Sequence, residues 1–192
     1  MNHFFAYMAR MKLIKRWSLM KSVSEENIAE HSAQVAQIAH ALAVIKNQKF
    51  GGTLNADRVA TLGLYHETSE VLTGDLPTPI KYYNPEIRKA YKDIEAVANE
   101  KLLSMLPDEL TAAYRPLVCA EENTYEYRLV KAADKIAAYI KCIEESRSGN
   151  REFARAEEAL RAEVERYYEY PEVKYFCDTF LDTFRKTLDE LE

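Results

Sequence analysis

Apolar residues recur at helical spacing along almost the whole chain, and this is the feature that most limits its possible folds. One example is the stripe that contains Ile28, Val35 and Leu42. Only 5 glycines and 6 prolines interrupt the 192 residues, so long helices can form without breaks. The sequence therefore predicts an all-α fold of about seven or eight helices, in a single domain over residues 1–192.

Interruptions of this spacing mark the expected ends of the helices. The first helix is expected to run from about residue 4 to Met20, and Ser24 or Asn27 is expected to cap the second. Asn55 is expected to cap the third. Between residues 73 and 85 the spacing fails, and glycine and proline there predict a long loop of a kind that is often functional. Further helices are expected at about residues 86–106, 109–118, 124–147, 150–168 and 172–190.

Charge and composition argue against several classes of protein. The formal net charge is -5, whereas proteins that bind nucleic-acid polymers usually carry a basic surface. We therefore expect no nucleic-acid partner. The cysteines, Cys119, Cys142 and Cys177, form no Cys-x-x-Cys pair and indicate reduced thiols in a cytoplasmic protein. No segment has the roughly 20 apolar residues of a membrane span, and the N-terminal residues do not resemble a signal peptide. We therefore expect no contact with a membrane.

Ionisable residues interrupt the apolar stripes at three places. His31 lies at the centre of the apolar face of the second predicted helix. His66 continues the apolar series of the third, Glu67 adjoins it, and Glu70 lies four residues beyond His66. Asp134 falls on the apolar stripe of a later helix. These side chains are therefore expected to face the interior.

Each inward residue has an ordinary explanation when it is taken alone. A single histidine can be a hydrogen-bonded core residue, and an aspartate can pair with a neighbouring lysine. Taken together, the unpaired groups would be costly to bury, and a shared divalent cation would satisfy them all. Imidazole and carboxylate ligands without thiolates suit a first-row metal such as Mn, Fe, Co, Ni or Zn. His40 is expected on the opposite face of its helix and is not a candidate ligand.

Four segments of the chain form a distinctive series: MARMKLIKRW, ENIAEHSAQVAQIAHALA, LYHETSEVLTGDLPTPIKY and LVKAADKIAAYIKCIEE. In order and spacing, they resemble the bacterial 5′-deoxynucleotidases of the HD-domain metal-dependent phosphohydrolase superfamily. This resemblance implies an HD-type helical bundle, one bound divalent metal ion and a homodimer. It also implies hydrolysis of a small-molecule substrate, a deoxyribonucleoside 5′-monophosphate, to the deoxynucleoside and phosphate.

The resemblance also implies roles for individual acidic and histidine residues. The implied metal ligands are His31, His66, Glu67 and Asp134. Glu70 matches the acidic residue that positions or deprotonates the attacking water. A further glutamate of the family matches either Glu121 or Glu122, because the alignment there is ambiguous by one residue.

A second group of residues is implied to bind the substrate. Arg16 matches a phosphate-contacting arginine, and Ser32 and Thr78 are further candidate contacts. Trp17 matches an aromatic residue that senses the missing 2′-hydroxyl, and Asp75 matches a loop carboxylate in the substrate pocket. Without the resemblance, Arg16 would be interpreted as an exposed charge at a helix end and Trp17 as a packing residue.

Position 67 departs from the HD pattern, since it holds Glu where the pattern has Asp. The extra methylene displaces the carboxylate, which leaves two interpretations: an altered but working metal site, or a weakened or lost one. Two other functions therefore stay open. One is an HD hydrolase acting on a nucleoside triphosphate, a cyclic nucleotide or an alarmone, and the other is a non-catalytic nucleotide-sensing module.

Overall fold

The chain is described by a computed structural model over residues 2–81 and 83–191, with every side chain except that of Thr78. This part of the chain folds into helices without a β-strand, which confirms the all-α prediction. Seven of its helices have ten residues or more, in agreement with the number expected. None of the helices in these residues is long and apolar enough to cross a membrane.

Three helices form the centre of the fold: α2 (Ile28–Lys49), α3 (Ala56–Tyr65) and α8 (Tyr125–Arg147). They pack against one another through a fully buried apolar core that includes Val35 and Ile136. Burial of this shared core is the main force that holds the three helices together. Asn27 and Asn55 begin α2 and α3 as predicted, because their side chains accept hydrogen bonds from the first free backbone N–H groups.

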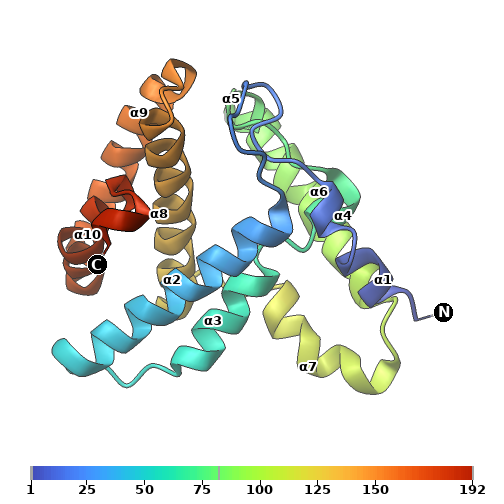
Figure 1. The fold of residues 1–192 in the computed structure, drawn as a ribbon. Helices are drawn as coiled ribbons and strands as arrows, with labels where there is room; N and C mark the ends of the chain where they lie inside the picture. Colours follow the sequence, from blue (N-terminus) through green and yellow to red (C-terminus); the bar gives the residue numbers. More distant parts are fainter. Residues whose placement is uncertain (1, 82, 192) are drawn as a thin grey trace.

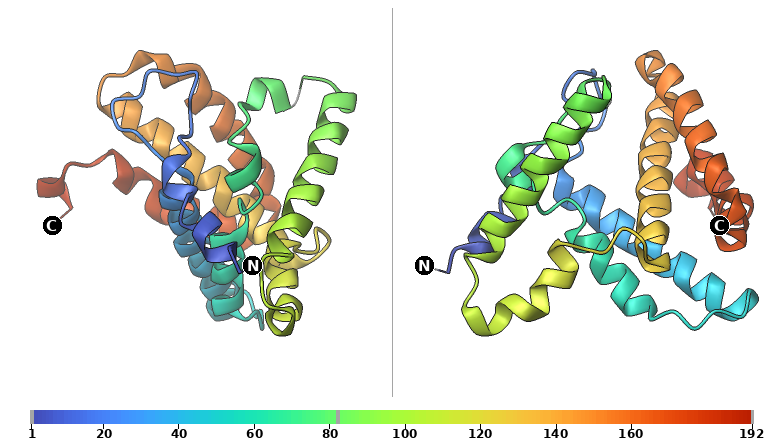
Figure 2. Two further views of the ribbon diagram at one scale, coloured as in Figure 1. Left: turned by 90° about the vertical axis from the view of Figure 1, so that its right-hand side faces the viewer. Right: turned by 180° about the vertical axis from the view of Figure 1, so that it is seen from behind.

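The remaining helices pack on two sides of this centre (Figure 1). Helices α9 and α10 pack on α8 and α2, whereas α1, α6 and α7 enclose a smaller apolar core around Phe4 and Leu102. The bounds are Phe4–Met8 for α1, Glu70–Thr73 for α4, Thr78–Lys81 for α5, Pro85–Leu103 for α6, Asp108–Val118 for α7, Ala154–Glu165 for α9 and Pro171–Phe180 for α10. The two ends of the chain lie on opposite sides of the molecule (Figure 2).

The first predicted helix is much shorter than expected. Helix α1 ends at Met8, a short 3-10 turn covers Met11–Leu13, and residues 14–27 are irregular apart from one isolated bridge. The apolar spacing was misleading there because Leu13 and Leu19 are exposed and bury no helix face. Trp17, at φ +57°, has a left-handed backbone that cannot continue a right-handed helix.

The other differences are smaller. The predicted loop over residues 73–85 contains α5, one turn of helix. The two C-terminal helices are also broken into shorter pieces, with 3-10 turns at Arg151–Phe153, Arg166–Glu169, Leu181–Arg185 and Leu188–Glu190. Phe153, in the first of these turns, is fully buried, whereas Leu188, in the last, is 82% exposed.

The irregular segment over residues 14–27 is fixed to the C-terminal end of α8 by a buried carboxylate. Glu145 is 1% exposed and accepts hydrogen bonds from the backbone N–H groups of Val23 and Ser24, at 2.8 and 3.1 Å. Lys141 donates to both Glu145 and the Ser24 carbonyl. All views place this segment, α5 and the junction of α8 with α9 at the same end of the molecule (Figures 1 and 2).

Glu145 is therefore expected to stabilise the protein by an amount that decreases at acidic pH. Burial opposes its ionisation, but the hydrogen bonds from Lys141 and the backbone outweigh burial and lower its pKa to about 2. A carboxylate whose pKa is lowered by folding contributes its full stability when the pH is above its unfolded-state pKa of about 4.3. This contribution is lost as the pH falls toward 2. The difference in free energy of unfolding between wild type and Glu145→Gln should shrink by roughly 2 to 3 kcal/mol from pH 5 to pH 2.

Urea unfolding at a series of pH values measures this difference. Glu152→Gln is the matched control, since the Glu152 carboxylate also accepts from this segment, at the Lys21 N–H (3.1 Å), but at an exposed position. It should retain the wild-type pH dependence. A gap between wild type and Glu145→Gln that stays constant over this pH range would contradict the assignment.

Candidate metal centre and active site

The four residues implied as metal ligands converge where α2, α8 and the end of α3 meet. The Asp134 Oδ1 atom lies 3.0 Å from Nε2 of His31 and 4.0 Å from Nε2 of His66. Glu67 Oε1 lies 3.2 Å from the same nitrogen of His66. One ligand atom from each of the four side chains lies within 4.8 Å of all the others, so a single ion could contact the whole group.

His66 reaches this cluster by a different route from the one predicted. Helix α3 ends at Tyr65, His66 caps it, and a turn leads to the short helix α4, so His66 and Glu70 do not share one continuous helix. The His66 Nδ1 atom donates to the Gly63 carbonyl at 2.7 Å, which fixes the orientation of the ring. The prediction that His66 and Glu70 face the interior still holds, since both are buried.

Gly63 also sets how closely α3 approaches α2. A Cβ atom at this position would lie 2.8 Å from Cα of Ala36 and 3.0 Å from its backbone nitrogen. These distances are shorter than a real contact permits, so only glycine allows this approach. The contact brings α3, and with it His66, toward the part of α2 that carries His31.

The hydrogen bond at Nδ1 decides what the other nitrogen of His66 can do. With the proton at Nδ1, a neutral His66 ring presents a bare lone pair at Nε2. This buried atom meets no hydrogen-bond donor in the part of the chain that the structure describes, and it faces Glu67 Oε1. Two acceptors face each other at 3.2 Å, an arrangement that a cation between them would stabilise. The donor set therefore fits a divalent metal ion.

The ionisation of the other candidate ligands agrees with this fit. Burial, followed by the charge of Arg16, lowers the pKa of His31 and keeps its imidazole neutral. Burial alone would raise the pKa values of Glu67 and Asp134. The proximity of the neighbouring histidines and of Lys131 outweighs it, and both pKa values lie well below the usual range. Neutral imidazoles and ionised carboxylates are the forms that ligate metal ions.

Glu70 lies beside this cluster and is not one of its four ligands. It is 3% exposed, and its Oε2 atom has no hydrogen-bond partner among the described residues. Burial first, and then the charges of Glu67 and Asp75, raise the pKa of Glu70 to about 11. The crowding of acidic groups around Glu70 again points to a site that needs a positive charge.

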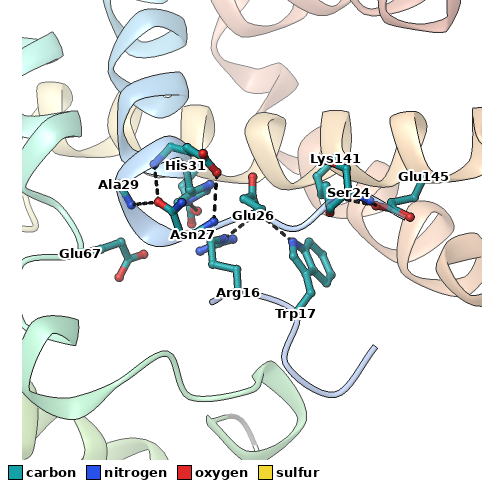
Figure 3. A network of polar contacts seen from close by, with 12 residues as sticks. Arg16, Trp17, Ser24, Glu26, Asn27, Ala29, His31, Glu67, Lys141 and Glu145 are labelled. Carbon is teal, nitrogen blue, oxygen red and sulfur yellow. Dashed lines mark hydrogen bonds and ion pairs between the residues drawn. The ribbon is translucent and has the colours of Figure 1, made fainter. Parts of the chain in front are cut away.

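Arg16 and Trp17 lie on the irregular segment and share one partner (Figure 3). The side chain of Arg16 is only 13% exposed, so it is not the exposed helix-end charge of the alternative interpretation. Oε2 of Glu26 accepts from Nε of Arg16 at 3.0 Å and from Nε1 of Trp17 at 2.9 Å. Sequence reasoning did not identify Glu26, since an irregular segment has no apolar period against which an inward carboxylate stands out.

The remaining predicted residues differ in how much the structure says of them. Ser32 is buried beside His31, and its Oγ atom has no partner in the described residues. Asp75 follows α4 and is partly buried, and burial raises its pKa although Arg16 opposes the rise. The side chain of Thr78 lies outside the described structure. His40 is half-exposed and lies 3.7 Å from Asp57.

A comparison with protein families adds to this geometry. The family described as "5′-deoxynucleotidase YfbR-like" matches residues 3–184. The chain belongs to the YfbR-like 5′-deoxynucleotidase family. A 5′-deoxynucleotidase of Vibrio vulnificus is 58% identical to this YfbR-like chain over 191 residues, which cover 99% of the chain and 98% of the relative. The 5′-deoxynucleotidase YfbR of Escherichia coli O127:H6 is 51% identical over 193 residues, 99% and 96% of the two chains.

Solved structures agree with this family assignment. An HD-domain phosphohydrolase from Listeria innocua has a TM-score of 0.82 and 25% identity to the YfbR-like chain, covering 95% of this chain and 88% of its own. A cyanophage S-2L HD phosphohydrolase, described as bound to dA and one catalytic Zn²⁺ ion, shares the fold at a TM-score of 0.65 and 17% identity over 93% and 96% of the two chains. The predicted family, HD-type fold and hydrolase class are confirmed.

Gly63→Ala tests the close contact that positions His66. Alanine inside a helix normally stabilises by about 1 kcal/mol relative to glycine. Here the added Cβ meets backbone atoms that cannot rotate away, and such overpacking costs about 1 to 3 kcal/mol. We therefore expect the variant to have a lower midpoint of urea unfolding than the wild type.

Leu64→Ala is the control, because Leu64 is the next residue of α3 and is 45% exposed. It should change the midpoint much less. An increase in stability of Gly63→Ala, the sign that helix propensity alone predicts, would show that α2 and α3 do not depend on this close contact.

Proposed function

We propose that His31, His66, Glu67 and Asp134 hold one divalent metal ion, and that this site carries the 5′-deoxynucleotidase activity of the family. The observation that supports it concerns Nε2 of His66. This atom has no hydrogen-bond partner in residues 2–81 and 83–191, and it faces one carboxylate oxygen at 3.2 Å and another at 4.0 Å. Nitrogen and oxygen donors without sulfur favour Mn, Fe, Co, Ni or Zn. The Zn²⁺ ion of the cyanophage relative makes zinc the first ion to test.

Arg16 is proposed to bind the 5′-phosphate. It is the residue with the most suitable donor geometry beside the cluster, since its planar guanidinium can give two parallel hydrogen bonds to a phosphate. Its Nε atom is occupied by Glu26, which leaves the Nη atoms for the substrate. A bound metal ion would supply Lewis-acid stabilisation of the phosphoryl oxygens and a water of lowered pKa.

Glu70 is proposed to orient the attacking water. When a bound cation offsets the acidic neighbours that keep this carboxyl protonated, its Oε2 atom would take the water's proton. This atom is buried and has no hydrogen-bond partner among the described residues, so it is available to a water on the substrate side. The attack forms a bond between phosphorus and the water oxygen and breaks the bond between phosphorus and O5′ of the sugar, which receives the proton held by Glu70. The products are the deoxynucleoside and inorganic phosphate.

The sugar and the rest of the substrate are proposed to lie against the segment of residues 14–27 and the turn after α4. Trp17 would discriminate against a 2′-hydroxyl, and Asp75, Ser32 and Thr78 would provide further contacts. A homodimer and a cytoplasmic location stay predictions. Size-exclusion chromatography with light scattering tests the first of them.

Phosphate release from a panel of nucleotides tests the proposed reaction. We expect deoxynucleoside 5′-monophosphates to be hydrolysed, prolonged chelation to abolish the activity, and a divalent first-row ion to restore it. Preference for a triphosphate, a cyclic nucleotide or an alarmone would favour the alternative HD hydrolase.

In the same assay, Glu70→Gln should lower kcat by about 100-fold or more, the scale of a positioned acid or base, while metal content is unchanged.

The loss of metal from Glu70→Gln would instead make Glu70 a ligand. Asp93→Asn is the control for a general effect of removing a carboxylate, because Asp93 pairs with Lys89 (2.8 Å) at an exposed position on α6. It should leave both kcat and metal content close to the wild type. Full activity in a wild-type preparation shown to be free of metal would refute the metal-dependent reaction itself.

Substitutions at Glu67 test whether its longer side chain still serves as a ligand. If it does, Glu67→Ala should lose metal and activity together, because the ion then loses one charged donor. Glu67→Asp should keep a bound ion with altered affinity or metal preference, because the shorter side chain changes the reach of the oxygen. Metal content and turnover are measured together for wild type and both variants.

The same series distinguishes the sensor interpretation. A damaged site would show little metal and little turnover in the wild type, and both would rise in Glu67→Asp. An active wild type that is unaffected by Glu67→Ala would leave only His31, His66 and Asp134 as ligands.

A further inference from the structure

Glu26 holds the two predicted substrate-binding residues with a single oxygen atom. Oε2 accepts from Nε of Arg16 and from Nε1 of Trp17, and Figure 3 shows the carboxylate between the two side chains. The Glu26 side chain is 12% exposed, so these hydrogen bonds are largely shielded from water. A backbone hydrogen bond also joins Arg16 to Glu26, because the Arg16 N–H donates to the Glu26 carbonyl at 2.9 Å.

The bond to Arg16 fixes the direction in which the guanidinium points. Glu26 takes the Nε position and is the only ion-pair partner of Arg16 within residues 2–81 and 83–191. The ion pair is therefore not bidentate, and Glu26 does not occupy the two Nη groups of the guanidinium. A carboxylate that binds only Nε leaves the two Nη groups together for a phosphate.

The bond to Trp17 fixes the plane of its ring. The indole is held at two points, by its N–H on Glu26 and by packing against Phe153 at a ring-centroid distance of 5.2 Å. Trp17 is also the only residue other than glycine with positive φ in the described part of the chain. Such a conformation is costly and persists only where surrounding contacts enforce it. Glu26 supplies one of those contacts.

We propose that Glu26 is a positioning residue that couples recognition of the phosphate to recognition of the sugar. Within the described residues, its side chain has hydrogen bonds or ion pairs with Arg16 and Trp17 and with none of the four predicted metal ligands. Its carboxylate sets the angle of Arg16 and the plane of Trp17 at the same time, so its removal disturbs both. This inference rests on the proposed function, in which Arg16 binds phosphate and Trp17 excludes the 2′-hydroxyl.

The test compares Glu26→Ala with Glu25→Ala, a neighbour in sequence. Glu25 also pairs with a basic residue, Lys15 at 2.6 Å, but both side chains are more than 60% exposed. Exposed pairs contribute little, so Glu25→Ala should behave as the wild type. Glu26→Gln keeps the size and an acceptor oxygen and should recover part of the loss.

For Glu26→Ala we expect three changes in binding. KM for deoxynucleoside monophosphates and the inhibition constant of inorganic phosphate should each rise about 10-fold, the scale of one lost charge-assisted hydrogen bond. The ratio of kcat/KM for deoxy- over ribonucleotides should fall by about the same factor. The metal content should be unchanged, and kcat should change less than KM.

Trp17 gives a readout that does not depend on catalysis. It is the only tryptophan of the chain, so fluorescence excited selectively at tryptophan, beyond the absorption of the 13 tyrosines, reports its surroundings. Its emission should shift in Glu26→Ala and stay unchanged in Glu25→Ala. Far-UV circular dichroism establishes that each variant is folded, and Glu26→Gln replaces Glu26→Ala if the latter is not.

The outcomes separate the inference from the function on which it rests. A wild type without activity on deoxynucleoside monophosphates overturns the proposed function. An active wild type whose KM, phosphate inhibition and deoxy-over-ribo ratio are all retained in folded Glu26→Ala overturns the positioning role. A shift in KM with an unchanged sugar ratio, or a loss of metal, overturns the coupling that we propose.

Discussion

The buried Asp134 carboxylate is the group on which the arrangement of the site depends. It lies on α8 and faces an imidazole from α2 and another from the end of α3, so it joins the three central helices at one point. A buried carboxylate without positive or hydrogen-bonding partners would oppose folding by several kcal/mol. The packing of the apolar core and the convergence of the four proposed ligands are therefore parts of the same folding event.

The two side chains that we propose to bind the substrate, Arg16 and Trp17, are held by polar contacts and not by helix packing. Arg16 and Trp17 lie on an irregular segment that buries little apolar surface of its own, and its shape is maintained by polar groups. Glu145 holds its far end through two backbone N–H groups, and Glu26 holds the side chains themselves. The proposed metal ligands thus lie on the central helices and the turn after α3, whereas the side chains that we propose to select the substrate lie on a loop that two carboxylates keep in place.

This division explains what the sequence could predict. His31 and Asp134 were found because each interrupts an apolar stripe of a real helix, where an inward charge is conspicuous. Lys141 and Glu145 carry the same signal on α8 and could have been recognised by it. The path of residues 14–27 could not be predicted, since the left-handed backbone of Trp17 and its bond to Glu26 follow from tertiary contacts and have no period in the sequence. The family resemblance identified Arg16 and Trp17 where periodicity did not.

The contact between Gly63 and Ala36 has a mechanical consequence. Side-chain contacts in a core yield when rotamers change, but here backbone meets backbone, and neither side can rotate out of the way. The contact acts as a rigid stop between α2 and α3, near the imidazoles of His31 and His66, whose ring centroids lie 5.4 Å apart. Substitutions elsewhere in the core should therefore weaken the fold as a whole before they alter the spacing of these two rings.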